Sequence, residues 1–153
     1  MIDEKDRQIL RILLDDASTS NAEIGRQLGL VASAISERIK RLRAAGVIRG
    51  YEVRLDAKAL GRPLLAFIFV TDAKPNLGFD TAAALSSVSG LEELHKIAGE
   101  DCYLLKVRTS GTDALNHIIE TQINTVQSVT RVRTTIVLNA VAERPCLADF
   151  DPG

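Results

Sequence analysis

The chain has 153 residues, enough for one domain or two small ones. Its composition, 46% hydrophobic and 25% charged, is that of an ordinary soluble globular protein. The longest apolar run, residues 64–70, is too short to cross a bilayer, and the opening Met-Ile-Asp-Glu has no basic and apolar signal segment. We therefore expect a cytoplasmic protein without a membrane partner.

The charge is unevenly distributed. A net charge of −1 would by itself argue against nucleic-acid binding, because nonspecific affinity comes from neutralising phosphates. Residues 1–62, however, contain 12 Lys/Arg against 9 Asp/Glu, whereas residues 63–153 contain 7 against 11, giving +3 and −4. Six cations and one acid lie within residues 38–54. This sign asymmetry indicates two halves with separate roles, the first of them basic.

The chain lacks the motifs of catalytic and metal sites. Cys102 and Cys146 have no CxxC spacing and no His at ligand intervals, so we expect reduced thiols and no metal. His95 and His117 have no nucleophile or second ligand at useful spacing. A Gly-rich phosphate loop, HExxH and GxSxG are also missing from the sequence. We expect no enzyme activity and no cofactor.

The first element in the chain is an expected helix. Asp3 is suited to cap it, and apolar residues follow at the i, i+3, i+4, i+7 interval, namely Leu10, Leu13, Leu14 and Ala17. The spacing predicts a helix with one buried face.

Two further helical patterns meet at Gly29. The first opens with Ser20 and has Glu23 three residues later, which predicts a capping box. Gly29 closes this helix where a left-handed residue is needed. The inner face of the helix is formed by Ile24 and Leu28.

The second pattern runs to Gly46 and exposes a polar, basic face. Its inner stripe is Ile35, Ile39 and Leu42. Hydroxyls and cations on the other side are what entry into a DNA major groove requires, so the pair of helices predicts a helix-turn-helix, winged or simple. The candidate DNA-binding residues are Ser33, Ser36, Glu37, Arg38, Lys40, Arg41 and Arg43.

These residues have different expected roles. Lys40, Arg41 and Arg43 would hold phosphates or guanines, the two serines phosphates or base edges, and Glu37 would accept from cytosine or orient an arginine. Arg38 lies nearer the inner stripe, and its alternative is to pair with an acid of the first helix. For the whole set, the alternative is a solvated helix face.

A linker separates the halves. Residues 47–55 alternate imperfectly and include Tyr51 and Val53, which fits a strand leading out of the head. Residues 56–63 contain the breakers Gly61 and Pro63 and mark a boundary.

The second half alternates strand and helix patterns. The order is β-α-β-β-α-β, with expected elements at residues 64–70, 79–88, 91–98, 102–109, 112–126 and 129–137. This predicts an α+β fold in which a ferredoxin-like βαββαβ sandwich has both helices on one sheet face. The other face includes apolar residues, and a partner subunit is its simplest cover.

The turn between the two central strands is a candidate ligand site. Gly99 and Asp101 suit a hairpin turn for purely structural reasons. The same turn could hold an α-amino acid, with its amides on the carboxylate and Asp101 on the ammonium group.

Together these segments resemble the Lrp/AsnC family of feast/famine transcription regulators. The resemblance rests on Ile2-Asp3 through Ile9-Leu10, AEIGRQLGL and AISERIKRLRAAGVIRGY, then AGEDCYLLKV and VQSVTRVRTTIVL, and covers about residues 2–142. It implies a dimer, often assembled into octamers, that binds double-stranded operator DNA and responds to an amino acid or related small molecule. The effector pocket would lie between dimers and include the closing strand, where Thr134 and Thr135 are candidates. Both could equally be ordinary strand residues.

The resemblance divides the chain into four parts. These are a helix-turn-helix domain (1–50), a strand and linker (51–62), an effector-sensing and oligomerisation domain (63–142) and a tail without an assigned role (143–153). One departure is Val31, where relatives usually have a capping Ser. Ser33 would then take over as the cap and start the helix about two residues later.

Two other classes stay open: a small-molecule enzyme with an accessory head, and a scaffold that compacts DNA without an effector. The missing nucleophile–base set argues against the enzyme, and insensitivity to every amino acid would favour the scaffold.

Overall fold

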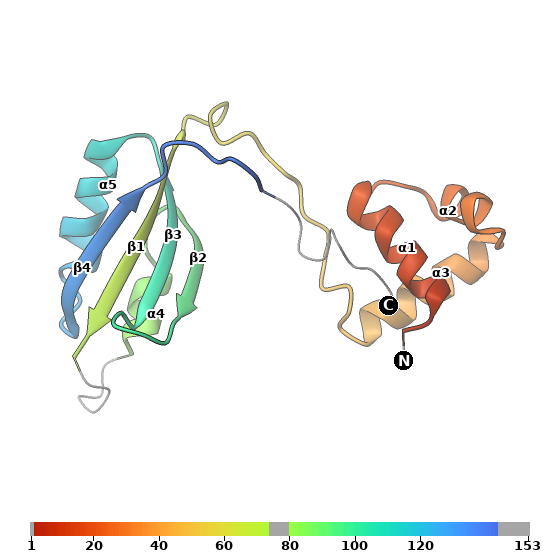
Figure 1. The fold of residues 1–153 in the computed structure, drawn as a ribbon, viewed down its shortest axis with the longest axis horizontal. Coiled ribbons are helices and arrows are strands. Elements are labelled where there is room, and N and C mark those ends of the chain that lie inside the picture. The colour runs from red at the N-terminus through yellow and green to blue at the C-terminus, as the bar shows by residue number, and fades with distance from the viewer. Residues whose placement is uncertain (1, 74–79, 144–153) are drawn as a thin grey trace. The chain divides into compact units, whose positions relative to one another are not determined.

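The computed structural model describes residues 2–73 and 80–143, which form two compact units (Figure 1). The first unit includes Met1–Val53 and the second is Arg54–Ala140. Cys146, Phe79 and all of the tail after residue 143 lie outside the described residues.

The first unit is a three-helix head. Its helices are α1 (Glu4–Asp15), α2 (Asn21–Leu28) and α3 (Ala32–Ala44). The predicted Asp3 cap is present and forms a capping box, because the Asp3 carboxylate accepts from the Asp6 amide at 2.8 Å and the Asp6 carboxylate from the Asp3 amide at 3.2 Å. Between the described residues 2 and 53 no strand is present, so the head has the simple three-helix form.

One of the two hydrogen bonds of the capping box predicted for α2 is present. Ser20 accepts from the Glu23 amide at 3.2 Å, and Gly29 ends the helix with a φ of 67°. The Glu23 carboxylate bonds to Arg26 and Gln27 of its own helix.

The predicted late start of α3 is wrong. The helix begins at Ala32 after an extended Val31, and Ser33 lies inside it. The turn explains this, because the Leu30 amide donates to the Gly25 carbonyl at 2.9 Å and fixes the backbone before the helix. The Val31 carbonyl then accepts from the Ala34 amide at 3.0 Å, with no side-chain cap.

The head core is built on three isoleucines. One comes from each helix, and Ile9, Ile24 and Ile35 are fully buried. The stripe predicted for the first helix is confirmed only in part. Leu13 packs against the isoleucines, but Leu14 is 41% exposed, Ala17 lies beyond the helix end, and the buried Ile9 was not in the predicted stripe. The inner stripe predicted for α3 is confirmed, with Leu42 buried and Ile39 packed against the isoleucines.

The segment after the head is not a strand. Residues 49–56 have no regular secondary structure, and a turn at residues 57–61 leads to β1. A strand needs a neighbouring strand to which its backbone can hydrogen-bond. Within the described chain, residues 51–55 form no backbone hydrogen bond with another segment. The alternation of Tyr51 and Val53 predicted a strand for which the described chain supplies no neighbour.

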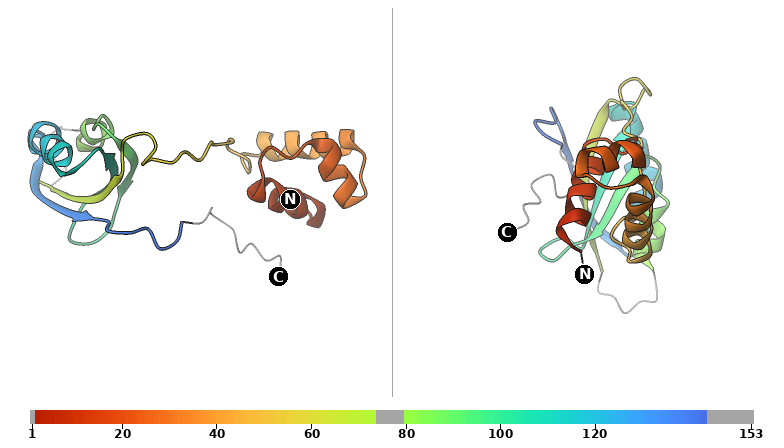
Figure 2. Two further views of the ribbon diagram at one scale, coloured as in Figure 1. Left: turned by 90° about the horizontal axis from the view of Figure 1, so that it is seen from above. Right: turned by 90° about the vertical axis from the view of Figure 1, so that its right-hand side faces the viewer.

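The second unit is an antiparallel sheet with two helices. Its elements are β1 (Leu64–Asp72), α4 (Thr81–Ser86), β2 (Leu91–Lys96), β3 (Tyr103–Thr109), α5 (Thr112–Ile118), a short π-helix (Ile119–Ile123) and β4 (Val129–Ile136). The strand order is β2-β3-β1-β4, and every neighbouring pair is antiparallel. Both helices cover the same sheet face (Figure 2). The predicted ferredoxin-like fold is confirmed.

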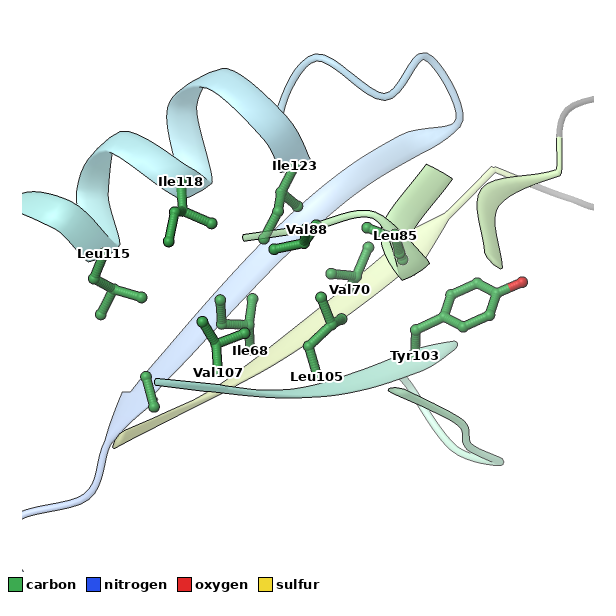
Figure 3. Packing of buried hydrophobic residues seen from close by; sticks show 11 residues of the cluster. Ile68, Val70, Leu85, Val88, Tyr103, Leu105, Val107, Leu115, Ile118 and Ile123 are labelled. Carbon is green, nitrogen blue, oxygen red and sulfur yellow. The ribbon is translucent and has the colours of Figure 1, made fainter. Parts of the chain in front are cut away.

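The core of this unit lies between the sheet and its helices. The inward side chains of the two central strands are fully buried beneath residues of α4, α5 and the π-helix (Figure 3). The labelled set includes Ile68, Val70, Leu105, Val107, Leu85, Leu115, Ile118 and Ile123. On the central strands this set alternates with Phe67, Phe69 and Leu104, which therefore lie on the sheet's other face, the open face. None of the described helices covers this face.

The described residues 2–73 and 80–143 contain no helix long and apolar enough to cross a membrane. The same residues contain no cluster of three or more His, Cys, Asp or Glu that could hold a metal ion.

Candidate DNA-binding helix and ligand-sensing turn

The outer face of α3 carries the predicted polar residues. Ser33, Glu37 and Lys40 are exposed, and Ser36 is half-buried beside them. Lys40 donates to the Glu37 carboxylate at 2.7 Å, which lowers the pKa of Glu37. Both side chains are 69% exposed, and such pairs are weak. The Lys40 ammonium is therefore available to exchange its carboxylate for a phosphate.

Two arginines extend this basic face toward the end of α3. The Arg41 side chain is 66% exposed and lies 3.6 Å from the Asp6 carboxylate. The Arg43 guanidinium lies 5.6 Å from the centre of the Tyr51 ring, a cation–π distance. Tyr51 thus has a structural contact with the head, although its segment is not a strand.

Arg38 makes the intramolecular contacts that the sequence offered as its alternative. Its guanidinium donates to Asp3 at 2.6 Å and to Asp6 at 2.7 Å, and its side chain is 25% exposed. The hydrogen bond from Arg38 is the main reason why the pKa of Asp3 is lowered, and the two carboxylates raise the pKa of Arg38. Among the predicted DNA-binding residues, Arg38 is therefore the one whose charge is committed to joining α3 to the start of α1.

A further contact joins α1 to α2. Lys5 donates to the Leu28 carbonyl at 3.2 Å, at the end of α2 where carbonyls lack helical partners. The helical pattern did not reveal this contact, because Lys5 lies 23 residues away in the chain.

The turn before β3 places Asp101 in an ionic site. Gly99 has a φ of 148°, in the region that favours glycine, and its missing side chain leaves open space. Asp101 is 8% exposed and accepts from the Thr71 hydroxyl at 3.1 Å and from the Arg133 guanidinium at 2.8 Å. The Arg133 hydrogen bond is the largest cause of a lowered Asp101 pKa. Asp101 is therefore an ionised carboxylate at neutral pH, paired with Arg133.

Arg133 is the residue that the sequence reasoning missed at this site. It lies opposite Phe69 in the β1–β4 register, and its guanidinium lies 4.0 Å from the centre of the Phe69 ring. The ring and the carboxylate together hold the cation on the open face of the sheet. A signal was available, since Arg131 and Arg133 alternate in the closing strand and so share one face.

The two candidate threonines of β4 do not lie together. Thr135 is paired with Phe67 on the open face, the same face as Arg133. Thr134 is paired with Ile68, whose side chain is in the core, so it lies on the opposite face from Asp101 and Arg133. The structure brings Asp101 and Arg133 together and separates Thr134 from them.

The chain combines a three-helix head that exposes a basic helix with a sheet domain whose turn carries the Asp101–Arg133 ion pair. This combination is typical of a DNA-binding regulator with a ligand-sensing domain. The chain belongs to the Lrp/AsnC family: residues 65–147 match the Lrp/AsnC ligand binding domain, and residues 2–49 match a winged helix-turn-helix DNA-binding domain. It is therefore a transcriptional regulator that binds DNA, and not an enzyme.

Named relatives are similar along nearly the whole chain. The HTH-type transcriptional regulator LrpA of Mycobacterium tuberculosis is 35% identical, over 90% of this chain and 91% of that protein. The leucine-responsive regulatory protein of Haemophilus influenzae is 30% identical, over 93% and 87%.

Solved structures show the same similarity. A feast or famine regulatory protein from M. tuberculosis, complexed with L-methionine, has a TM-score of 0.86 at 34% identity and covers 94% of this chain and 96% of that one. The AsnC structure from E. coli has a TM-score of 0.86 at 29% identity, covering 95% and 98%.

Proposed function

We propose that α3 is the recognition helix and that its outer face contacts operator DNA. The observation that carries this proposal is the exposure of this basic face on a helix whose opposite side is anchored in the head core. Lys40, Arg41 and Arg43 hold phosphates or guanines, Ser33 and Ser36 hydrogen-bond to phosphates or base edges, and Glu37 accepts from a cytosine or orients Lys40. Arg38 supports this face from behind through its ion pairs with α1.

We propose that the protein acts as a homodimer. The face of the sheet without helices carries Phe67, Phe69 and Leu104, each half-buried within one chain, and a second copy would cover them. A two-fold dimer presents two recognition helices, so the operator is a pseudo-palindrome whose half-sites lie about one helical turn apart, or a multiple of it. Further assembly into octamers follows the pattern that the family resemblance implies, and the cytoplasm is the expected location.

We propose an amino acid as the effector, bound at the turn that contains Gly99 and Asp101. The support is chemical: the open turn at Gly99 offers amides to a carboxylate, and Asp101 is an ionised acceptor for an ammonium group. Arg133 is paired with Asp101 at this site, and its guanidinium is a second group that could bind the carboxylate of the amino acid. Because Asp101 and Arg133 are paired in the described structure, an amino acid would exchange this ion pair for contacts with its own charged groups. Thr135 lies two residues after Arg133 in β4, on the same face of the sheet.

The proposed effector is tested by a thermal-shift screen of the twenty amino acids. A ligand that binds only the folded state increases the free energy of unfolding, by about 2.7 kcal/mol at a concentration of 100 times Kd, and so raises the melting temperature. A positive amino acid should also change the affinity for an operator obtained by in vitro selection. If none of the twenty alters melting or DNA binding, the effector proposal is wrong, and the alternative of a scaffold that compacts DNA without an effector is favoured.

A further inference from the structure

Val31 is an apolar side chain held in solvent at the start of α3. It is 69% exposed and immediately precedes the first helical residue. Its side chain makes no cap bond, whereas the residues favoured at this position, Ser, Thr, Asp and Asn, would satisfy an amide of the first turn. Val31 therefore contributes neither to the core nor to the cap of its helix.

The backbone around Val31 is closely fixed. Gly25 of α2 lies so close to the Leu30 carbonyl that a Cβ at Gly25 would collide with that oxygen. The Leu30 amide returns a hydrogen bond to the Gly25 carbonyl at 2.9 Å, and the Leu30 side chain packs on the head core. Because the turn is anchored on both sides, little backbone ordering is needed when Val31 makes an intermolecular contact.

The first turn of α3 has no long hydrogen-bonding side chain. It contains Ala32, Ser33 and Ala34, and the first long polar residue on the exposed face is Glu37. The N-terminal residues of a recognition helix are those that contact base edges in helix-turn-helix proteins. Short side chains let this end of the helix approach the groove floor, where an apolar group distinguishes one base, thymine, by its C5 methyl.

We propose that Val31 is a specificity-determining residue that contacts a thymine methyl group in each half-site of the operator. This inference rests on the proposed role of α3 as the recognition helix. It adds a preference for thymine through an apolar contact, which the hydrogen-bonding and charged side chains of the polar face do not make with a methyl group.

The test removes the methyl group and leaves the rest of the base unchanged. An operator is selected from random duplexes with the full chain, and each thymine is replaced in turn by deoxyuridine. For the unchanged protein we expect one thymine in each half-site at which replacement weakens binding about fourfold, the value of burying one methyl group.

Two variants separate the apolar contact from the helix cap. Val31→Ser and Val31→Thr both place a good capping hydroxyl before α3, so both should melt at or above the temperature of the unchanged protein. Threonine keeps one of the two valine methyl groups, and serine keeps none. We expect Val31→Ser to bind the thymine and deoxyuridine operators equally, while Val31→Thr retains part of the difference.

Three results would overturn the proposal. One is an operator in which replacing thymine by deoxyuridine weakens binding at no position. This result would reject the role of Val31 but not the proposed phosphate contacts of α3. Another is a Val31→Ser protein that keeps the full difference at the same thymine. A selection that yields no common sequence would contradict the recognition-helix assignment itself, and the role of Val31 with it.

Discussion

Arg38 of α3 donates to the carboxylate of Asp6 in α1 at 2.7 Å, and the Asp6 side chain is 4% exposed. The same carboxylate accepts from the Asp3 amide, so one buried acid joins the start of the first helix to the third. Lys40, two residues further along α3, has a side chain that is 69% exposed. The head therefore holds Arg38 closely against α1, while the Arg41 side chain, 3.6 Å from Asp6, and the Lys40 side chain remain 66% and 69% exposed.

Replacing Arg38 by Ala should destabilise the head. The buried Asp6 carboxylate would lose its close cationic partner, and we expect the free energy of unfolding to fall by about 1–2 kcal/mol, since Arg41 stays 3.6 Å away. Denaturant unfolding followed by circular dichroism measures this change. Lys40→Ala is the matched control, because its exposed pair with Glu37 contributes little. Equal effects of the two substitutions would contradict the structural role of Arg38.

Replacing Lys40 and Arg41 by Ala should weaken operator binding without unfolding the protein. The logarithm of the binding constant falls linearly with the logarithm of the salt concentration, and each lost phosphate contact makes this slope shallower by roughly 0.9. Fluorescence anisotropy at several salt concentrations measures both affinity and slope. Lys96→Ala, an exposed lysine of β2 in the sheet domain, should leave both unchanged. An unaltered slope in the double variant would show that this face of α3 does not contact the DNA phosphates.

The fold could be predicted from the sequence because most of its signals are local. Asp3 and Ser20 begin helices with their own side chains, Gly29 ends one, and the alternation of strand and helix patterns in the second half gives the ferredoxin-like order. The start of α3 could not be predicted in this way. It depends on the close approach of Gly25 to Leu30, a contact between helices that no capping pattern records.

The candidate sites were predicted less completely, because they depend on pairs distant in the chain. Asp101 was identified from its turn, but its partner Arg133 lies 32 residues further on and meets it through the β1–β4 register. The same register places Thr134 and Thr135 on opposite faces, which the choice of neighbouring threonines overlooked. Arg38 is a partial exception, since pairing with an acid of the first helix was offered as its alternative, although the two acids, 32 and 35 residues earlier, could not be named.

Residues 63–142 expressed alone should fold and dimerise. The core between the sheet and its helices lies within this segment, and the face with Phe67 and Phe69 needs a cover. Light scattering at micromolar concentration measures the mass. A folded monomer would show that the sheet face does not form the proposed dimer.

Replacing Asp101 by Asn should separate effector binding from folding. Asn supports the local hydrogen bonds of the turn, so the fold should survive. The variant lacks the charge that would receive an ammonium group, and loss of a charge-assisted bond should lower affinity for the amino acid found by thermal shift about tenfold or more, while operator binding without effector changes little. Calorimetry measures the affinity. Thr134→Val, on the other sheet face, is the control and should bind normally.

The same variant gives a pH signature. Arg133 lowers the pKa of Asp101 in the folded protein below the ordinary carboxyl value of about 4. The stabilisation from this ion pair is therefore complete above that ordinary value and is lost as the pH falls through the lower folded value. The stability difference between the unchanged protein and Asp101→Asn should persist at neutral pH and shrink in acid below about pH 4. A difference that stays constant into acid would mean that Asp101 is not held by Arg133. Normal effector binding by Asp101→Asn at neutral pH would place the pocket elsewhere.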